Sequence, residues 1–537
     1  MKTKLAPKIL TILFALTLSI ILAGCGGGGG NVSAGDNPSA GSETDTSSPA
    51  IPANSNATPV SSSRIDLSWD AATDNVSVTG YRIYRDGTYL KSVTELSTSD
   101  SHLNGGRRYC YRIAAFDAAG NESSPSEDFC ATTMPAWSGI KQMGTATYDN
   151  AFGMTVDVSG NVYVTGVTYG DLEGNPGSGE HDVILVKYND SGTRQWTKQI
   201  GASLDDYGNS VAADGSGNIY VAGYTSGSLV GNASAGKDDI ILVKYNASGT
   251  KQWSRQLGSP DVDEALSVAV DGSGNVYVAG ATYSSLDGYT RAGEYDIVLV
   301  KYSSAGEKQW IRQLGSAATD EAYALAVDTS GNAYITGLTA GDLDGNTGTG
   351  GYDMFLVKYD TTGTKQWTKQ FGTASDDYGY GVAMDSGGNI YVAGTTAGGI
   401  EGNVNAGGND VFLVKYNAAG TVQWIRQLGS SADDVSWGIA VDLSGNIFVA
   451  GGTDGDLDGN TNAGNYDMFL VKYNESGEKQ WTRQMGSEVN DEAYGVAVNP
   501  DGNIFVTGYT YGNLAGNTNA GESDIFVAKY DTNGVRQ

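Results

Sequence analysis

A phrase of the form Gln-Trp-x-(Arg/Lys)-Gln-apolar-Gly recurs along most of the chain. Its tryptophans are Trp196, Trp253, Trp310, Trp367, Trp424 and Trp481, and each follows the previous one by 57 residues. A fixed period of this length indicates one supersecondary unit, which cannot bury its apolar face alone and must stack against further copies. The period therefore constrains the fold more strongly than any other feature of the sequence.

Each unit contains four strand-like runs, which we call a, b, c and d. In the fifth copy they occupy residues 380–384, 390–394, 411–415 and 423–428. Run a has small residues at alternate positions, which suits an innermost strand where sheets converge. Run c is apolar on both faces, as a strand covered on both sides should be. Seven such units predict a seven-bladed β-propeller over residues 137–537.

The two ends of the array complement each other. It starts with a d-type run at 140–143 and ends after a c run at Tyr530 with only a short stub. We expect the N-terminal run to complete the last blade as its outer strand, because closure removes exposed strand edges. Trp137 precedes Gly144 by seven residues, whereas Trp196 precedes Gly201 by five, so its place stays open.

The repeat resembles the SBBP β-propeller repeat of bacterial exported proteins. The residues that carry the resemblance are Asp385, Gly388-Asn389, the run from Asp410 to Tyr416, Gly420 and Trp424. The resemblance implies the propeller fold. It supplies no general activity and no catalytic residues to carry over.

Residues 55–134 show short alternating runs at 64–69, 80–84 and 109–115, separated by turn residues. This pattern predicts a small antiparallel sandwich. It resembles a fibronectin type III domain, which implies that Trp69 is the core tryptophan and that Tyr109 or Tyr111 forms the tyrosine corner. The complete prediction is all-β: a fibronectin type III sandwich, then a seven-bladed propeller.

Residues 1–24 have a basic start and an apolar run that is short for a membrane span. The run ends Leu22-Ala-Gly-Cys25, which resembles the lipobox of bacterial lipoproteins. The resemblance implies lipidation of Cys25 and a membrane anchor, and Gly26 in place of Asp favours the outer membrane. An ordinary secretory signal is the alternative. Residues 25–54, rich in Gly, Ser, Asn and Thr, read as a flexible linker.

Export would place the remaining cysteines in an oxidising compartment. Cys110 and Cys130 fall in the expected last two strands of the sandwich. We expect a disulfide between them, with two buried free thiols as the alternative.

The chain has 32 Lys plus Arg against 61 Asp plus Glu, a net charge of −29. Nucleic acid is a poor partner for it, because phosphate contacts need Lys and Arg. Two His and three Cys cannot supply the zinc clusters of a typical metalloenzyme. The near-identical blades carry no singular carboxylate cluster of the kind that a glycosidase needs. We therefore expect no enzyme.

The loops between runs b and c suggest calcium, which takes oxygen ligands. An Asp-x-Asp-Gly-Asn pattern, often followed by the aspartate that opens run c, gives these candidate ligands: Asp171, Glu173, Asn175, Asp342, Asp344, Asn346, Asp353, Asp456, Asp458, Asn460 and Asp467. The alternative is that these side chains close turns onto backbone N–H groups.

An aspartate also recurs in every d–a loop, at Asp149, Asp206, Asp263, Asp320, Asp377, Asp434 and Asp491. The d–a and b–c loops share one face of a propeller, so we expect that face to gather most loop carboxylates. One position of run a carries mostly large residues, namely Phe152, Asn209, Leu266, Tyr323, Tyr380, Trp437 and Tyr494. These pack between blades or stack on a sugar.

Three function classes remain. An envelope lipoprotein that binds or adheres to a protein or glycan through its acidic loop face fits best. A structural or assembly scaffold of the envelope is the alternative, and a glycan-active enzyme is the third. If binding is correct, the acidic face favours partners that are basic or bridged by cations.

Overall fold

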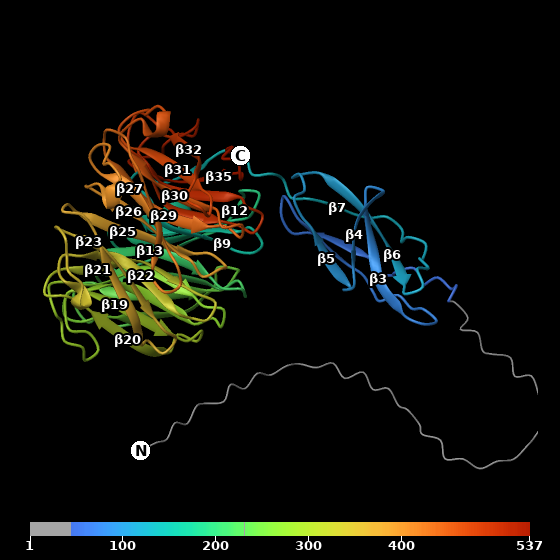
Figure 1. Cartoon of the computed structure of the whole chain (residues 1–537), viewed down its shortest axis with the longest axis horizontal. Coiled ribbons are helices and arrows are strands. Elements are labelled where there is room, and N and C mark those ends of the chain that lie inside the picture. Colours follow the sequence, from blue (N-terminus) through green and yellow to red (C-terminus); the bar gives the residue numbers. More distant parts are fainter. Residues whose placement is uncertain (1–44, 230) are drawn as a thin grey trace, which may run out of the picture.

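A computed structural model describes residues 45–229 and 231–537. These residues form an N-terminal β-sandwich and a larger ring of four-stranded sheets (Figure 1). The signal segment and Cys25 lie outside the described residues. Within those residues no helix is long and apolar enough to cross a membrane.

The sandwich consists of two antiparallel sheets. One holds β1 (Asn56–Pro59), β2 (Ile65–Ser68) and β5 (Ser97–Asp100), and the other holds β4 (Thr88–Val93), β3 (Val78–Arg85), β6 (Arg108–Asp117) and β7 (Phe129–Thr132). Trp69 lies in the core and packs edge-on against Tyr81. The Tyr109 hydroxyl accepts the backbone N–H of Asn104 at 2.9 Å, which is the contact of a tyrosine corner.

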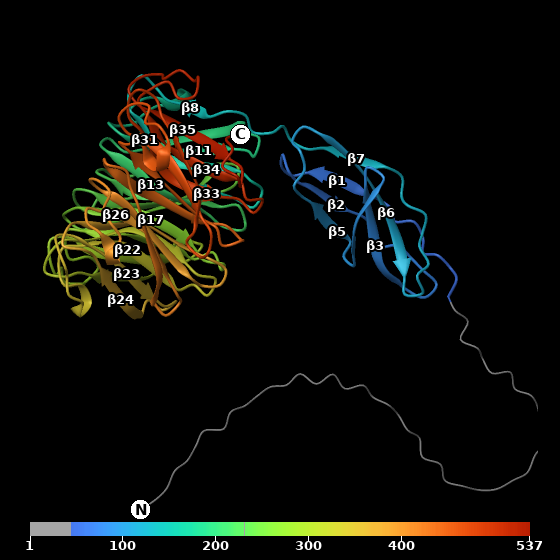
Figure 2. The ribbon, with the colours of Figure 1, turned by 45° about the horizontal axis from the view of Figure 1, so that its top comes forward.

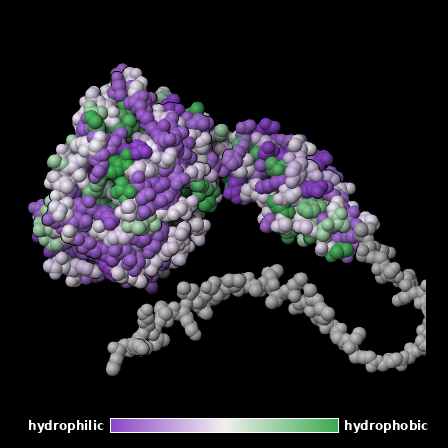
Figure 3. Space-filling model, in the orientation of Figure 1, coloured by the Kyte–Doolittle hydropathy of each residue, from purple (hydrophilic) through white to green (hydrophobic). Residues whose placement is uncertain are grey.

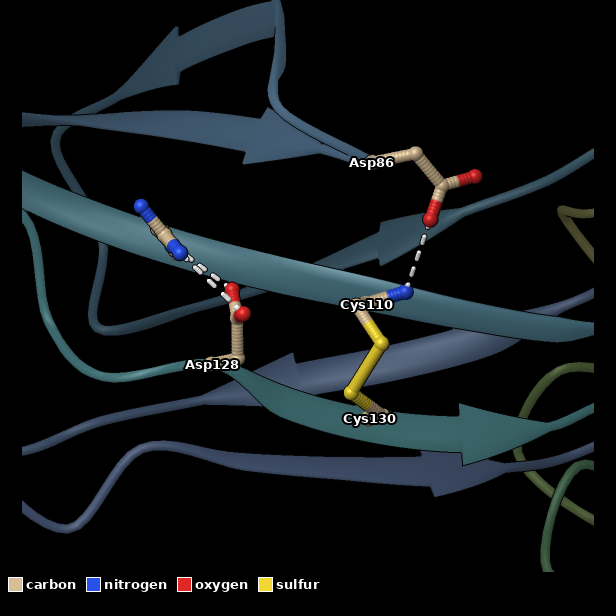
Figure 4. Close-up of a disulfide and its surroundings, with 5 residues drawn as sticks. Asp86, Cys110, Asp128 and Cys130 are labelled. Carbon is tan, nitrogen blue, oxygen red and sulfur yellow. Dashed lines mark hydrogen bonds and ion pairs between the residues drawn. A yellow bond between two sulfur atoms is a disulfide. The ribbon is translucent and has the colours of Figure 1, made fainter.

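Cys110 and Cys130 form a disulfide, as the sequence predicts. The two residues lie directly opposite each other on the paired strands β6 and β7 (Figure 4). The Cys110 backbone N–H donates to Asp86 at 3.0 Å, which joins the same place to the β3–β4 turn.

The ring has seven blades. In each blade, strand a lies nearest the centre of the ring and strand d lies at its rim. Blade 1 is β9 (Asp149–Val156), β10 (Val162–Thr168), β11 (Asp182–Tyr188), β12 (Arg194–Ile200); blade 2 is β13 (Asp206–Ala213), β14 (Ile219–Thr225), β15 (Asp239–Tyr245), β16 (Lys251–Leu257); blade 3 is β17 (Asp263–Val270), β18 (Val276–Thr282), β19 (Asp296–Tyr302), β20 (Lys308–Leu314); blade 4 is β21 (Asp320–Val327), β22 (Ala333–Thr339), β23 (Asp353–Tyr359), β24 (Lys365–Phe371).

The remaining blades follow the same plan. Blade 5 is β25 (Asp377–Met384), β26 (Ile390–Thr396), β27 (Asp410–Tyr416), β28 (Val422–Leu428); blade 6 is β29 (Asp434–Val441), β30 (Ile447–Thr453), β31 (Asp467–Tyr473), β32 (Lys479–Met485); blade 7 is β33 (Asp491–Val498), β34 (Ile504–Thr510), β35 (Asp524–Tyr530) and β8 (Lys141–Met143). One-turn 3-10 segments lie in four b–c loops: η1 (Leu172–Gly174), η2 (Leu343–Gly345), η3 (Ile400–Gly402) and η4 (Leu457–Gly459).

The core lies between blades rather than within one. Strands b and c are buried almost throughout, and each apolar cluster of the ring combines residues of adjacent blades. This arrangement makes every blade depend on its neighbours, as the repeat period predicts.

The repeated tryptophan of strand d joins one blade to the next. The Trp253 indole packs on the blade 3 turn at Gly306, whose φ of +78° suits glycine. Arg255 lies over the same indole and donates from Nε to the Gly306 carbonyl at 2.6 Å. The Gln-Trp-x-(Arg/Lys) phrase is therefore an interblade clasp.

The ring closes as the sequence predicts. β8, from the start of the array, pairs with β35 near its end, and Figure 2 shows the two side by side. The C-terminal stub adds the rest of this outer strand: Arg536 bridges Tyr530, and the Gln537 carbonyl accepts the Gly139 N–H at 3.0 Å. Two chain segments thus build the last strand.

The structure also gives Trp137 its place. In six blades a strand b aromatic packs against the strand d tryptophan, as in the Tyr163–Trp196 pair. Trp137 forms the seventh such pair with Phe505 and covers the blade 1 turn at Gly192. It is 3 % exposed. Trp137 therefore replaces the tryptophan that blade 7 lacks.

Candidate functional site

The d–a and b–c loops share one face of the ring, which we call the loop face. The a–b and c–d turns share the other, the turn face. This arrangement follows from the antiparallel order of each blade. The a–b turns behave as hairpin turns: Asp157 Oδ1 accepts the N–H groups of Ser159 and Asn161, both at 2.9 Å.

The aspartates that begin strand a do not form an acidic surface, which corrects the expectation from sequence. All seven are fully buried. Asp149 shows their role: Oδ1 accepts the Thr168 hydroxyl and Oδ2 accepts the Thr145 N–H, both at 2.5 Å. Burial raises the pKa of each, and the pKa of Asp206 reaches about 6. They fix the d–a loop to strand b.

The acids at the tips of the b–c loops do not lie on the loop face, where the sequence predicts them. Asp344 pairs with Lys365, the first residue of β24, and accepts the Thr368 hydroxyl at 2.7 Å. Asp458 pairs in the same way with Lys479. Strand d begins at the turn face, so each tip folds back along the outer strand. The lysine that begins strand d neutralises the acid in both loops.

The other candidate calcium ligands close turns. Asp171, Asp342 and Asp456 accept the N–H groups of Gly177, Gly348 and Asn462 at 2.7–2.9 Å. Asn175, Asn346 and Asn460 donate to the carbonyls of Leu172, Leu343 and Leu457 at 2.8–2.9 Å. Glu173 pairs with Arg194. Asp353 and Asp467 are buried, and each accepts an N–H four residues before it, at 2.9 Å.

These contacts favour the turn interpretation, and calcium stays a prediction. Within the described residues, one group of three carboxylates has ligand atoms within 4.8 Å of one another. It lies in the sandwich, at Asp45, Asp74 and Asp117, and the sequence analysis missed it. Hydrogen bonds already engage all three: Asn75 donates to Asp45, Val76 to Asp74 and Asn121 to Asp117.

Around the ring axis, aromatic rings from five innermost strands pack in an unbroken series. Tyr323 contacts Tyr380, Tyr380 contacts Trp437, Trp437 contacts Tyr494 and Tyr494 contacts Phe152, with centroids 4.5–5.7 Å apart. We call these five residues the aromatic belt. Asn209 and Leu266 interrupt it in blades 2 and 3. The belt supports packing between blades, and its rings are partly buried.

Three glutamates occupy the position two residues before the belt position, near the loop-face end of strand a. They are Glu264, Glu321 and Glu492, which we call the axial carboxylates. Tyr323 donates to Glu321 at 3.0 Å, and Tyr509 donates to Glu492 at 2.9 Å. No Lys, Arg or His of the described chain forms an ion pair with any of the three.

Glu264 is the most perturbed of these groups. Burial, with added repulsion from Asp238 and Glu321, raises its pKa to about 7. Burial also raises the pKa of Glu321. The repeat pattern does not single out this set, because the position varies among the copies, with Asn150, Tyr207, Tyr378 and Val435 in the other blades. That variation within a near-invariant repeat was the available signal.

The architecture defines a seven-bladed β-propeller preceded by a β-sandwich. Seven segments match the SBBP beta-propeller repeat: 139–173, 195–229, 252–287, 309–344, 366–401, 423–458 and 480–515. The chain therefore carries seven SBBP repeats.

Similar proteins match this chain over stretches of very different length. The regulatory protein FlaEY of Caulobacter vibrioides is 27 % identical over 420 residues, covering 70 % of this chain and 43 % of FlaEY. An alpha-amylase of Niallia circulans is 48 % identical over 89 residues, 17 % of this chain and 7 % of the amylase. The chain thus spans less than half of either relative. The WD40 domain of Neurospora crassa Pan2 aligns over 73 % of this chain and 97 % of its own, at 11 % identity and a TM-score of 0.41.

Proposed function

We propose that this protein is a binding module of the bacterial cell envelope, held at the outer membrane by a lipid on Cys25. In this proposal the sandwich is a fibronectin type III spacer, and the loop face of the propeller binds a protein or glycan partner through basic groups. The protein has no catalytic role.

The observation that carries the proposal is the set of axial carboxylates beside the aromatic belt. A half-buried carboxylate without a cationic neighbour is costly to keep ionised. A partner's ammonium or guanidinium group would relieve that cost, and adjacent aromatic faces attract the same cations. The net charge of −29 would speed the approach of such a partner at low salt.

The test compares two triple variants of the full chain by titration with a short lysine-rich peptide. The first is Glu264→Gln, Glu321→Gln and Glu492→Gln on the loop face. The matched control is Glu307→Gln, Glu475→Gln and Glu478→Gln on exposed c–d turns of the turn face. Both remove three negative charges, so a difference between them reports position rather than net charge.

We expect the loop-face variant to bind the peptide at least tenfold more weakly than the wild type, and the control to bind it equally well. Added salt should weaken wild-type binding. Equal affinities in all three proteins would refute the proposal.

An envelope scaffold is the second candidate. The observation that favours it is that the aromatic belt residues pack on one another across five blades. In that case the belt holds the ring together, and the axial carboxylates would be dispensable for binding.

A further inference from the structure

The sandwich contacts the propeller at the seam where the ring closes. Ser62 donates its backbone N–H to Asp190 Oδ2 at 2.6 Å, and its hydroxyl donates to the same oxygen. Ser63 donates its hydroxyl to Asp501 Oδ2 at 2.6 Å. Asp190 lies in the c–d turn of blade 1 and Asp501 in the a–b turn of blade 7, which are the two blades that meet at the seam.

Asp190 also joins those two blades directly. Lys529 Nζ, from strand c of blade 7, lies 3.2 Å from Asp190 Oδ1. The lysine is 4 % exposed and the aspartate 1 %. One carboxylate therefore binds blade 7 through one oxygen and the sandwich through the other.

Other blade junctions use a different partner for this lysine. Lys187, Lys244, Lys301, Lys415 and Lys472 each donate to a backbone carbonyl in the next c–d turn at 3.0–3.3 Å. Lys415 also pairs with the exposed Glu475 carboxylate at 3.2 Å, whereas at the seam a buried carboxylate takes the place of the carbonyl. At the seam both the donor and the acceptor are charged, so the contact is a buried ion pair.

The two aspartates depart from the repeat. At the position of Asp190 the other copies have Ala247, Ser304, Thr361, Ala418, Glu475 and Thr532. At the position of Asp501 they have Ser159, Ser216, Ser273, Ser330, Gly387 and Ser444. Ring packing alone does not require Asp at either place, because the other copies pack without it. What Asp190 and Asp501 have in common is that both accept hydrogen bonds from the sandwich.

We infer that the sandwich is a latch on the closing seam, and that Ser62, Asp190 and Lys529 bind sandwich, blade 1 and blade 7 into one rigid unit. The contacts at this junction are hydrogen bonds from Ser62 and Ser63, and Figure 3 shows the sandwich and the propeller meeting at one end of the sandwich. A rigid junction on the turn face leaves the loop face uncovered by the sandwich.

The test variant carries Asp190→Thr and Asp501→Ser in the full chain. Both new residues occur at the equivalent positions of other blades. Lys529 can then bond to the carbonyl of residue 190, as Lys472 does to Thr532, so the ring should still close. The matched control is Glu475→Thr, which makes a similar change in the blade 6 turn. Distances are measured between labels at Val76 and Val404, two exposed residues of the sandwich and propeller.

We expect a narrow distance distribution in the wild type and the control, and a broad one in the double variant. Cleavage by protease in the connecting segment 133–139 should become at least tenfold faster. Identical distributions and cleavage rates in all three proteins would overturn the inference.

A second variant covers the case in which Asp190→Thr prevents folding. Ser62→Ala with Ser63→Ala changes only the sandwich and leaves every propeller residue in place. It removes both hydroxyl contacts but keeps the Ser62 N–H bond to Asp190. It should therefore broaden the distribution, though less than the aspartate variant does, and an unchanged narrow distribution would also overturn the latch.

Discussion

The glycine that begins each d–a loop faces the buried aspartate of strand c, and in four of the loops the aspartate of strand a lies beside it too. A β-carbon on Gly258 would lie 1.7 Å from Asp239 Oδ1, and one on Gly201 would lie 1.8 Å from Asp182 Oδ1 and 2.9 Å from Asp206 Oδ2. The glycine therefore allows the aspartates of strands a and c to be buried next to each other.

Replacing this glycine should be costly. We expect Gly258→Ala to lower the free energy of unfolding by about 1–3 kcal/mol, because a methyl group must displace a buried carboxylate. Gly215→Ala is the control, since a β-carbon there meets no atom within 4 Å. Denaturant unfolding of both variants measures the difference, and equal losses would contradict this explanation.

Asp206 should make stability fall as the pH rises. Its pKa is raised from 3.8 to about 6 in the folded state, mainly by burial. Between these values the folded protein holds more protons than the unfolded chain, so its stability declines as pH increases through that window. Asp206→Asn should flatten the decline between pH 4 and 6 in denaturant titrations. An unchanged slope would show that this carboxylate does not titrate as described.

At the level of single elements, the outer strand of blade 7 is assembled from β8 and the C-terminal stub, with Trp137 alongside. Because this tryptophan is buried and supports the closure, we expect Trp137→Ala to cost about 3–5 kcal/mol of stability. Trp253→Ala, at a half-exposed clasp inside the array, should cost less. Hydrogen exchange at β35 should quicken only in the first variant, and equal effects of the two substitutions would argue against a special role for the seam.

The b–c loop tips provide another test at this level. We expect calcium to shift the thermal midpoint little, because Asp344 and Asp458 are neutralised by lysines and Asp342 and Asp456 close turns. A cation at a hundredfold excess over its Kd would stabilise the fold by about 2.7 kcal/mol. A rise of that size, reversed by a chelator, would show that calcium displaces the lysines.

The repeat period and the four runs per copy were sufficient to predict the blades, and the d-type run at 140–143 predicted the closing strand. Two features could not be predicted. The role of Trp137 depends on packing across the seam, which its offset from Gly144 conceals. The burial of Asp149 and its counterparts depends on the paired glycine and threonine, while in sequence a buried aspartate looks like an exposed one.

On the scale of the whole molecule, the charges sort by depth. The recurrent aspartates are buried inside the blades, and the loop-tip acids are paired with lysines at the rim. Among the described residues, the axial carboxylates have no ion pair and, unlike the recurrent aspartates, are only partly buried. A basic partner can therefore reach the third group.

Binding at that place should depend on pH. Because the pKa of Glu264 is about 7, the ionised form that attracts a cation becomes more populated between pH 6 and 8. Affinity for a lysine-rich peptide should therefore rise over this range, and Glu264→Gln should remove most of the rise. A pH-independent affinity in the wild type would exclude Glu264 from the binding site.

The most direct test of the account is a hydrogen-exchange map of the full chain with and without the lysine-rich peptide. We predict protection at the d–a loops and at the starts of β17, β21 and β33, with the a–b and c–d turns unchanged. Protection confined to the turn face, or none on the propeller at saturating peptide, would contradict the claim that the loop face is the binding surface.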